Sequence, residues 1–331
     1  MSEIIVPSKE LWIPKNYSVY IKPSESDISQ RKLDGYRKLA EIKQWGINNP
    51  TKFMSIFLGV DLLDAQEYVF MNSWTKPFAL WLESRAAGKT TMLALYSMMK
   101  GLLFNNYRIY ICSGTADQSQ ETFKKIEDIA LKNIESMTGL TDVFKNEVEI
   151  SQSSSNGFVH NPMGFTYSLY NGSFVKTLNS NIDAKRGKRC ESVIFDEGGW
   201  LSEEVFNVIG AFTALNSNFK LGGDIDISAL PSEFPHQLLY ASSASSVDTS
   251  FYNKYRDFSK KMFLGDPRYF VADINCDIVI NATFRGKLYP ASLLNKETVE
   301  EKSSQSSINR SDVSSCMLAL ATIPNNCEFI L

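Results

Sequence analysis

Residues 82–91 read Leu82-Glu83-Ser84-Arg85-Ala86-Ala87-Gly88-Lys89-Thr90-Thr91. They follow an apolar run at 77–81 and open a helical pattern at 92–104. A strand, a turn of small residues, Gly-Lys-Thr and a helix form the context of a phosphate-binding loop. Small residues let backbone N–H groups close around phosphate oxygens, and the helix N-terminus adds its dipole. We therefore expect a nucleotide to contact Ser84, Arg85, Ala86, Ala87, Gly88, Lys89, Thr90 and Thr91.

This stretch departs from the common pattern G-x-x-x-x-G-K-[ST], because Glu83 stands where the first glycine belongs. Alone, it is equally compatible with a surface turn before a core helix. A second stretch, Ser192-Val193-Ile194-Phe195-Asp196-Glu197, favours the nucleotide site. A short apolar run is typical of a buried parallel strand, and here it ends in two acids. Together the two stretches predict a site for ATP and Mg²⁺.

Each residue type suits a separate task in phosphoryl transfer. Lys89 can reach the β- and γ-phosphates, while the Thr90 hydroxyl and the Asp196 carboxylate are the predicted Mg²⁺ ligands. Glu197 is the predicted general base, which orients the attacking water. The alternative for both acids is a strand end followed by a capping turn at Gly198-Gly199.

Arg85 lies inside the loop and could stabilise charge on the γ-phosphate, which would make it catalytic together with Lys89 and Glu197. Without nucleotide it could instead pair with Glu83 or Glu197.

The composition indicates a globular chain with a sizeable core. Of 331 residues, 44% are hydrophobic and 21% charged, so one large domain or two ordinary ones fit. The net charge of −3 means that nucleic-acid contacts would need a local basic patch. Five cysteines without a C-x-x-C pair and two histidines argue against a structural zinc site. No signal-peptide pattern and no apolar run of about 20 residues occur, so we expect a cytosolic protein without a membrane span.

Strand and helix patterns alternate along the chain. A strand over 107–113 precedes an amphipathic helix over 116–134, and Asn171-Gly172 separates two alternating runs that predict a hairpin. The predicted fold class is α/β: a three-layer P-loop NTPase with a largely parallel sheet, an N-terminal helical segment and a β-hairpin insert. The predicted organisation is an arm and helix at 1–50, an ATPase domain at 51–280 and a polar tail at 281–331.

Over residues 50–275 the chain resembles the large subunit of viral DNA-packaging terminases, the ATPase of tailed phages. That family's phosphate loop commonly reads Ser-Arg-x-x-Gly-Lys-Thr/Ser, without the early glycine, and residues 84–90 fit it. Three further features match: an Arg-Gly element at 186–187, the acidic strand at 193–197, and a small-residue coupling motif at 241–244. An upstream glutamine that reads adenine in the family corresponds to Gln66.

The resemblance implies ATP hydrolysis that drives double-stranded DNA into a capsid. It gives Gln66 a contact with adenine, though a polar turn residue fits equally well. It gives Ser242 and Ser243 a role in coupling, though packing of a small-residue strand is the alternative. A basic segment could contact DNA or a neighbouring subunit's ATP, or be a solvated loop: Lys185, Arg186, Lys188 and Arg189.

The partners implied are double-stranded DNA, a portal protein, a terminase small subunit and further copies in a homo-oligomeric ring, in the host cell cytoplasm. Family members usually carry a ribonuclease-H-like nuclease domain. The chain after Asp277 is too short for one, so we expect no nuclease activity. Two alternatives remain: another ATP-driven translocase such as a helicase, and a truncated, non-catalytic nucleotide- or partner-binding protein.

Overall fold

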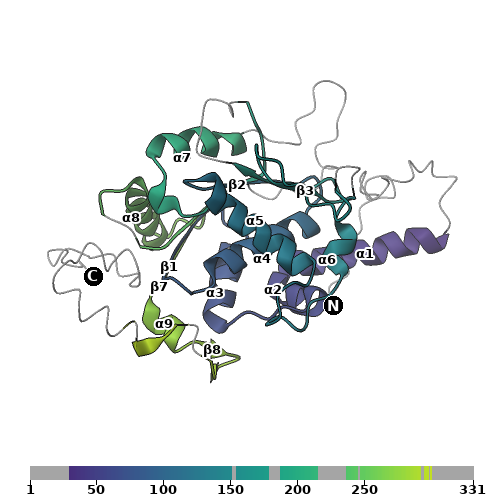
Figure 1. Cartoon of the computed structure of the whole chain (residues 1–331), viewed down its shortest axis with the longest axis horizontal. Coiled ribbons are helices and arrows are strands. Elements are labelled where there is room, and N and C mark those ends of the chain that lie inside the picture. The colour runs from purple at the N-terminus through teal and green to yellow at the C-terminus, as the bar shows by residue number, and fades with distance from the viewer. Residues whose placement is uncertain are drawn as a thin grey trace.

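The computed structural model describes residues 30–150, 154–178, 187–214, 236–244, 247–291, 294–297 and 299 (Figure 1). Two residues of the basic segment, Lys185 and Arg186, lie outside these ranges.

A seven-stranded sheet forms the centre of the molecule. Its strands are β1 (Phe78–Glu83), β2 (Arg108–Cys112), β3 (Thr166–Ser168), β4 (Phe174–Leu178), β5 (Ser192–Phe195), β6 (Gln237–Ser242) and β7 (Tyr269–Ile274). Their order across the sheet is β3-β4-β2-β5-β6-β1-β7, and every pair is parallel except β3 with β4. The strand over 78–83 and the strand before Asp196 therefore occur as predicted.

Helices cover both faces of the sheet (Figure 1). One core cluster joins the sheet to α3 (Asp64–Ser73), α4 (Lys89–Leu103) and α5 (Ala116–Ala130), and another joins it to α7 (Glu203–Gly210) and α8 (Ser250–Phe263). Side chains along β1 alternate between the clusters: Ala79 and Trp81 belong to the first, Leu80 and Leu82 to the second. This alternation is the pleat of a strand buried on both faces. The predicted three-layer α/β fold is confirmed.

The remaining elements lie around this body. They are α1 (Gln30–Asn48), α2 (Pro50–Phe53), a π-helical turn (Met54–Leu58), α6 (Val143–Glu147), two 3-10 turns (Gly198–Trp200 and Ala211–Thr213), α9 (Cys276–Ile280), β8 (Thr283–Phe284) and β9 (Lys287–Leu288). The predicted N-terminal helical segment is α1, which projects from the body in Figure 1. Within the described ranges, no helix combines the length and apolar character that a membrane span requires.

The predicted hairpin is continuous with the main sheet. β3 and β4 pair antiparallel around Asn171-Gly172, with Gly172 in the left-handed region at φ 82°. β4 also pairs parallel with β2, so the hairpin forms the sheet edge instead of a separate insert. The buried Asn171 amide donates to the carbonyl oxygens of Gly101 (2.7 Å) and Phe104 (3.0 Å), which satisfies the C-terminal end of α4.

The chain after residue 280 begins with packed structure where the sequence predicts a polar tail. The β8–β9 hairpin is held by the Asp64 carboxylate at the start of α3. This carboxylate accepts hydrogen bonds from Thr283 Oγ1 (2.6 Å), Arg285 N (2.7 Å) and Gly286 N (2.8 Å). Leu294 and Val299 lie in a small apolar cluster with Ala87 of the phosphate loop. The packed region therefore extends past the predicted boundary.

Candidate nucleotide-binding site

The phosphate loop (residues 84–90) connects β1 to α4. Two of its residues have positive φ, Ala86 at 63° and Gly88 at 89°. A Cβ atom at Gly88 would stand 2.7 Å from Gln66 Nε2, so glycine is required both by backbone conformation and by space. Helix α4 then begins at Lys89, and its first N–H groups lack intrahelical partners. These groups give the loop its capacity to bind anions.

Gln66 anchors this loop from α3. Its Nε2 donates to the Ala87 carbonyl oxygen (2.8 Å), and its Oε1 accepts from the Leu63 amide (3.2 Å). The side chain thus fixes the backbone of the loop, a contact that the sequence does not predict. Its contact with adenine stays a prediction.

The lysine of the loop lies beside both acids of the second stretch. Lys89 Nζ donates to Asp196 Oδ1 at 3.0 Å and to Glu197 Oε1 at 2.5 Å. Burial alone would lower the Lys89 pKa, but the carboxylates of Asp196 and Glu197 outweigh it and hold the pKa above its usual value. Residues more than a hundred positions apart therefore form one charged cluster.

The sheet topology brings them together. β6 lies between β1 and β5, and all three run parallel, so their carboxyl ends share one edge. The end of β6 contacts the turn after β5, because Ser242 Oγ accepts from the Gly199 amide at 3.0 Å. Ser243, the next residue, lines the pocket described below. Their coupling role stays a prediction.

The Asp196 carboxylate is fixed by residues that the sequence analysis did not identify. Thr122 Oγ1 of α5 donates to Asp196 Oδ2 at 2.6 Å, and the Glu197 amide donates to Oδ1 at 2.9 Å. Ser113 Oγ, directly after β2, donates to the Asp196 carbonyl oxygen at 2.8 Å. Asp196 is 3% exposed, and Thr122 is fully buried. A threonine next to Phe123 on the buried face of an amphipathic helix was the available signal.

Glu197 has an unusual backbone for its residue type. Its φ is 51° and its ψ 44°, the left-handed region that non-glycine residues rarely occupy. The 3-10 turn Gly198–Trp200 follows at once. Strained backbone of this kind recurs at functional sites and costs about 1–3 kcal/mol. The conformation is compatible with a positioned base and also with a capping turn.

A pocket of about 520 Å³ opens over the loop and the acids. It is lined by Ser84, Arg85, Ala86, Gly88, Lys89, Thr90, Thr91, Gln118, Glu121, Asp196, Glu197, Trp200, Ser243 and Ala244. Gln118, Glu121 and Trp200 were not predicted. Ala87 and Gln66 line a second cavity instead, and Lys188 and Arg189 line neither. Arg85 is exposed, and within the described part of the chain it forms no ion pair with Glu83 or Glu197.

The oxygen donors in this pocket fit Mg²⁺. The described residues contain no group of three His, Cys, Asp or Glu side chains that could cage a metal. Mg²⁺ is usually held by one or two protein oxygens together with substrate phosphates and water. The Thr90 hydroxyl and the Asp196 carboxylate, which border the same pocket, are such a sparse set.

Comparisons with known proteins place the fold. Models of protein families and curated proteins give no match to this sequence. Among solved structures, the HK97 bacteriophage large terminase aligns with a TM-score of 0.56 and 14% identity, over 81% of this chain and 54% of that chain. The large terminase of a thermophilic bacteriophage aligns at 0.49 and 12%, over 79% and 54%. The ATPase domain of the Thermus phage P74-26 large terminase aligns at 0.38 and 15%, over 66% and 96%.

The chain spans about half the length of the first two of these proteins. At this level of identity the likeness concerns the fold. The resemblance expected from the sequence is therefore confirmed in three dimensions: this chain has the α/β fold of the bacteriophage large terminases.

Proposed function

We propose that this chain is a Mg²⁺-dependent ATPase, the motor subunit that drives double-stranded viral DNA into a capsid as part of a terminase. One observation carries the proposal. Lys89 of the phosphate loop contacts both Asp196 and Glu197 at the carboxyl edge of a parallel sheet. A phosphate-binding lysine beside two acids is the minimal set for phosphoryl transfer to water.

The proposed roles follow from position. Lys89 and Arg85 bind the phosphate oxygens, and Thr90 and Asp196 would hold Mg²⁺. When bound, Mg²⁺ neutralises charge on the β- and γ-phosphate oxygens. Glu197 accepts a proton from the attacking water as the new P–O bond forms and the bond to the bridging oxygen breaks. ADP and inorganic phosphate are the products.

Glu197 must first leave Lys89. A carboxylate held by an ammonium group at 2.5 Å is a poor base, because the positive charge stabilises its ionised form. Phosphate oxygens that attract Lys89 would release Glu197 toward the water. In this scheme nucleotide binding itself activates the base.

The partners are proposed from the resemblance. They are double-stranded DNA, a portal protein, a terminase small subunit and further copies of this chain in a ring, in the host cell cytoplasm. For DNA or a neighbouring subunit, the proposed contacts are Lys188 and Arg189, together with Lys185 and Arg186. We also propose that 51–280 is the ATPase domain and that nuclease activity lies elsewhere.

The test is ATP turnover of the purified chain with and without double-stranded DNA, beside Glu197→Gln. Glu204→Gln, an exposed acid of α7 outside the pocket, is the matched control. We expect turnover that DNA stimulates, that Glu197→Gln abolishes and that Glu204→Gln retains. Unwinding of a duplex would favour the helicase alternative, and bound ATP without turnover would favour the non-catalytic one.

A further inference from the structure

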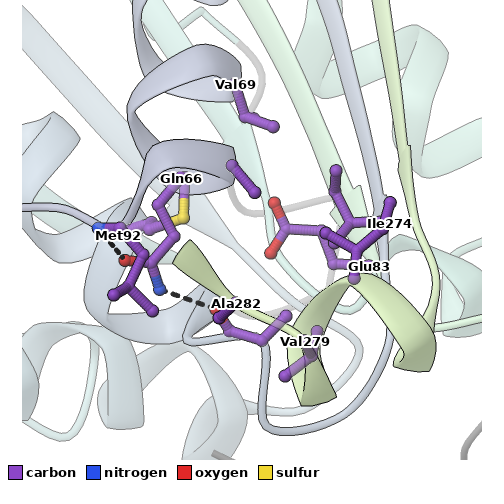
Figure 2. Close-up of a pocket in the computed structure, with 11 residues that line it drawn as sticks. Gln66, Val69, Glu83, Met92, Ile274, Val279 and Ala282 are labelled. Carbon is purple, nitrogen blue, oxygen red and sulfur yellow. Dashed lines mark hydrogen bonds between the residues drawn. The ribbon is translucent and has the colours of Figure 1, made fainter. Parts of the chain in front are cut away.

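A second cavity lies against the phosphate loop and contains a buried carboxyl group. Its volume is about 20 Å³, room for roughly one water-sized group. Glu83, the last residue of β1, is 1% exposed, and neither carboxyl oxygen has a hydrogen-bond partner within the described chain. Figure 2 shows the carboxyl group directed into the space between Val69, Gln66 and Met92.

The walls of this cavity offer the carboxyl group nothing polar in return. They are mainly apolar side chains from four elements: Val69 of α3, Met92 of α4, Ile274 of β7 and Val279 of α9. Burying a polar group without a hydrogen bond costs free energy, and an isolated charge costs far more. Burial raises the pKa of Glu83 to about 7, against the opposing charge of Lys89. A neutral acid has both an O–H donor and a carbonyl acceptor available for a ligand.

The position of the cavity restricts what that ligand can be. Ala87 lines it, while the loop residues on either side, Ala86 and Gly88, line the phosphate pocket. A molecule with its phosphates in the pocket could therefore place its other end here. Ile278 also lines the cavity and is 40% exposed, so the cavity meets the surface beside α9.

We propose that Glu83 hydrogen-bonds the exocyclic amino group of the adenine base, and so contributes to the choice of nucleotide. The inference rests on the proposed function, because it requires phosphates in the loop. The amino group is one heavy atom and fits the volume, while the flat ring packs against apolar side chains at the mouth, Leu63 and Ile278. The carbonyl oxygen of Glu83 accepts the N–H, and its O–H can donate to the adjacent ring nitrogen.

The test compares ATP with purine riboside triphosphate, which differs only by lacking the amino group. Equilibrium binding is measured for the wild-type chain, Glu83→Gln and Glu83→Leu. Gln reproduces the acceptor and donor of a neutral acid, whereas Leu removes both. We expect the wild-type chain and Glu83→Gln to bind ATP about tenfold more tightly than the analogue, the effect of one buried hydrogen bond. In Glu83→Leu the two affinities should become equal.

Two results would overturn the proposal. One is equal affinity of the wild-type chain for ATP and the analogue, as a cavity filled only by water predicts. The other is a tenfold preference that persists in Glu83→Leu. Glu83→Met serves as a second apolar variant should Leu prevent folding. If the wild-type chain binds neither nucleotide, the proposed function fails as well, which separates the two failures.

Discussion

The Lys89 ammonium group is shared between two carboxylates, and its shorter contact is with the more exposed one. Nζ lies 2.5 Å from Glu197 Oε1 and 3.0 Å from Asp196 Oδ1. The Glu197 side chain is 28% exposed and that of Asp196 4%. Asp196 has further donors in Thr122 and the Glu197 amide. The contact with Glu197 is therefore the one that nucleotide can break at low cost.

Glu197→Gln should change ATP binding and ATP turnover in opposite directions. The amide competes less well for Lys89, so phosphate oxygens meet less competition. A partly exposed ion pair contributes about 1 kcal/mol, which corresponds to roughly fivefold tighter ATP binding. Loss of the base should lower turnover by about 10²- to 10⁴-fold. Titration calorimetry and a phosphate-release assay measure the two effects. Weaker ATP binding by the variant would contradict the competition.

Thr122→Val should weaken the metal site without contacting it. Valine keeps the shape but removes the donor to Asp196 Oδ2, which frees the carboxylate to rotate. We expect the Mg²⁺ concentration for half-maximal turnover to rise several-fold and the free energy of unfolding to fall by about 1–2 kcal/mol. A Mg²⁺ titration and denaturant unfolding test this.

Two variants of the same helix serve as controls for this prediction. Thr122→Ser keeps the hydroxyl and should restore the wild-type Mg²⁺ requirement. Ser119→Ala removes another buried hydroxyl, which donates to the Ala116 carbonyl oxygen and not to Asp196. A raised Mg²⁺ requirement in Ser119→Ala would mean that any loosening of α5 suffices.

The sheet and the phosphate loop could be predicted because their signals are local. An apolar run before Ser84 and another before Asp196 each mark a buried parallel strand within a few residues. Parallel strands bring their carboxyl ends to one edge, so the meeting of Lys89 with Asp196 followed from the fold class. The glycine at 88 was likewise readable from the loop pattern.

Other parts of the site depend on contacts between distant segments. The contact of Thr122 with Asp196 joins α5 to the end of β5, and no spacing in the sequence encodes it. Glu83 reads as a missing glycine, yet its burial comes from α3, β7 and α9 closing around it. The continuity of the hairpin with the sheet depends on pairing between β4 and β2. Periodicity gives the face of an element but not the partner opposite it.

Lys100 should make stability rise with pH above neutrality. It is buried on α4, donates to the Trp74 carbonyl oxygen at 2.6 Å and lies 4.3 Å from the centre of the Trp74 ring system. Burial lowers its pKa from 10.5 to about 7. Between pH 7 and 10.5 the unfolded chain binds a proton that the folded chain does not, so the free energy of unfolding increases with pH. Chemical unfolding at about pH 7, 8 and 9 should show this slope.

Lys100→Met should remove that contribution to the slope, because methionine has no titrating group and suits an aromatic environment. Lys52→Met, at an exposed position of α2, should leave the slope unchanged. A wild-type slope that persists in Lys100→Met would assign the pH dependence to other groups.

Glu83 should have the opposite effect at lower pH. Its pKa is raised from 4.5 to about 7, chiefly by burial, with Lys89 lowering it and Asp196 raising it. Between pH 4.5 and 7 the folded chain keeps a proton that the unfolded chain releases, so the free energy of unfolding falls as pH rises, by roughly 3 kcal/mol in all. Glu83→Gln cannot ionise and should lack this fall. Melting curves of both proteins from about pH 4.5 to 7.5 isolate the effect, because titration of the other groups cancels in their difference. A constant difference across this range would mean that Glu83 is already paired and charged in the folded chain, which would also remove the neutral acid available to a base.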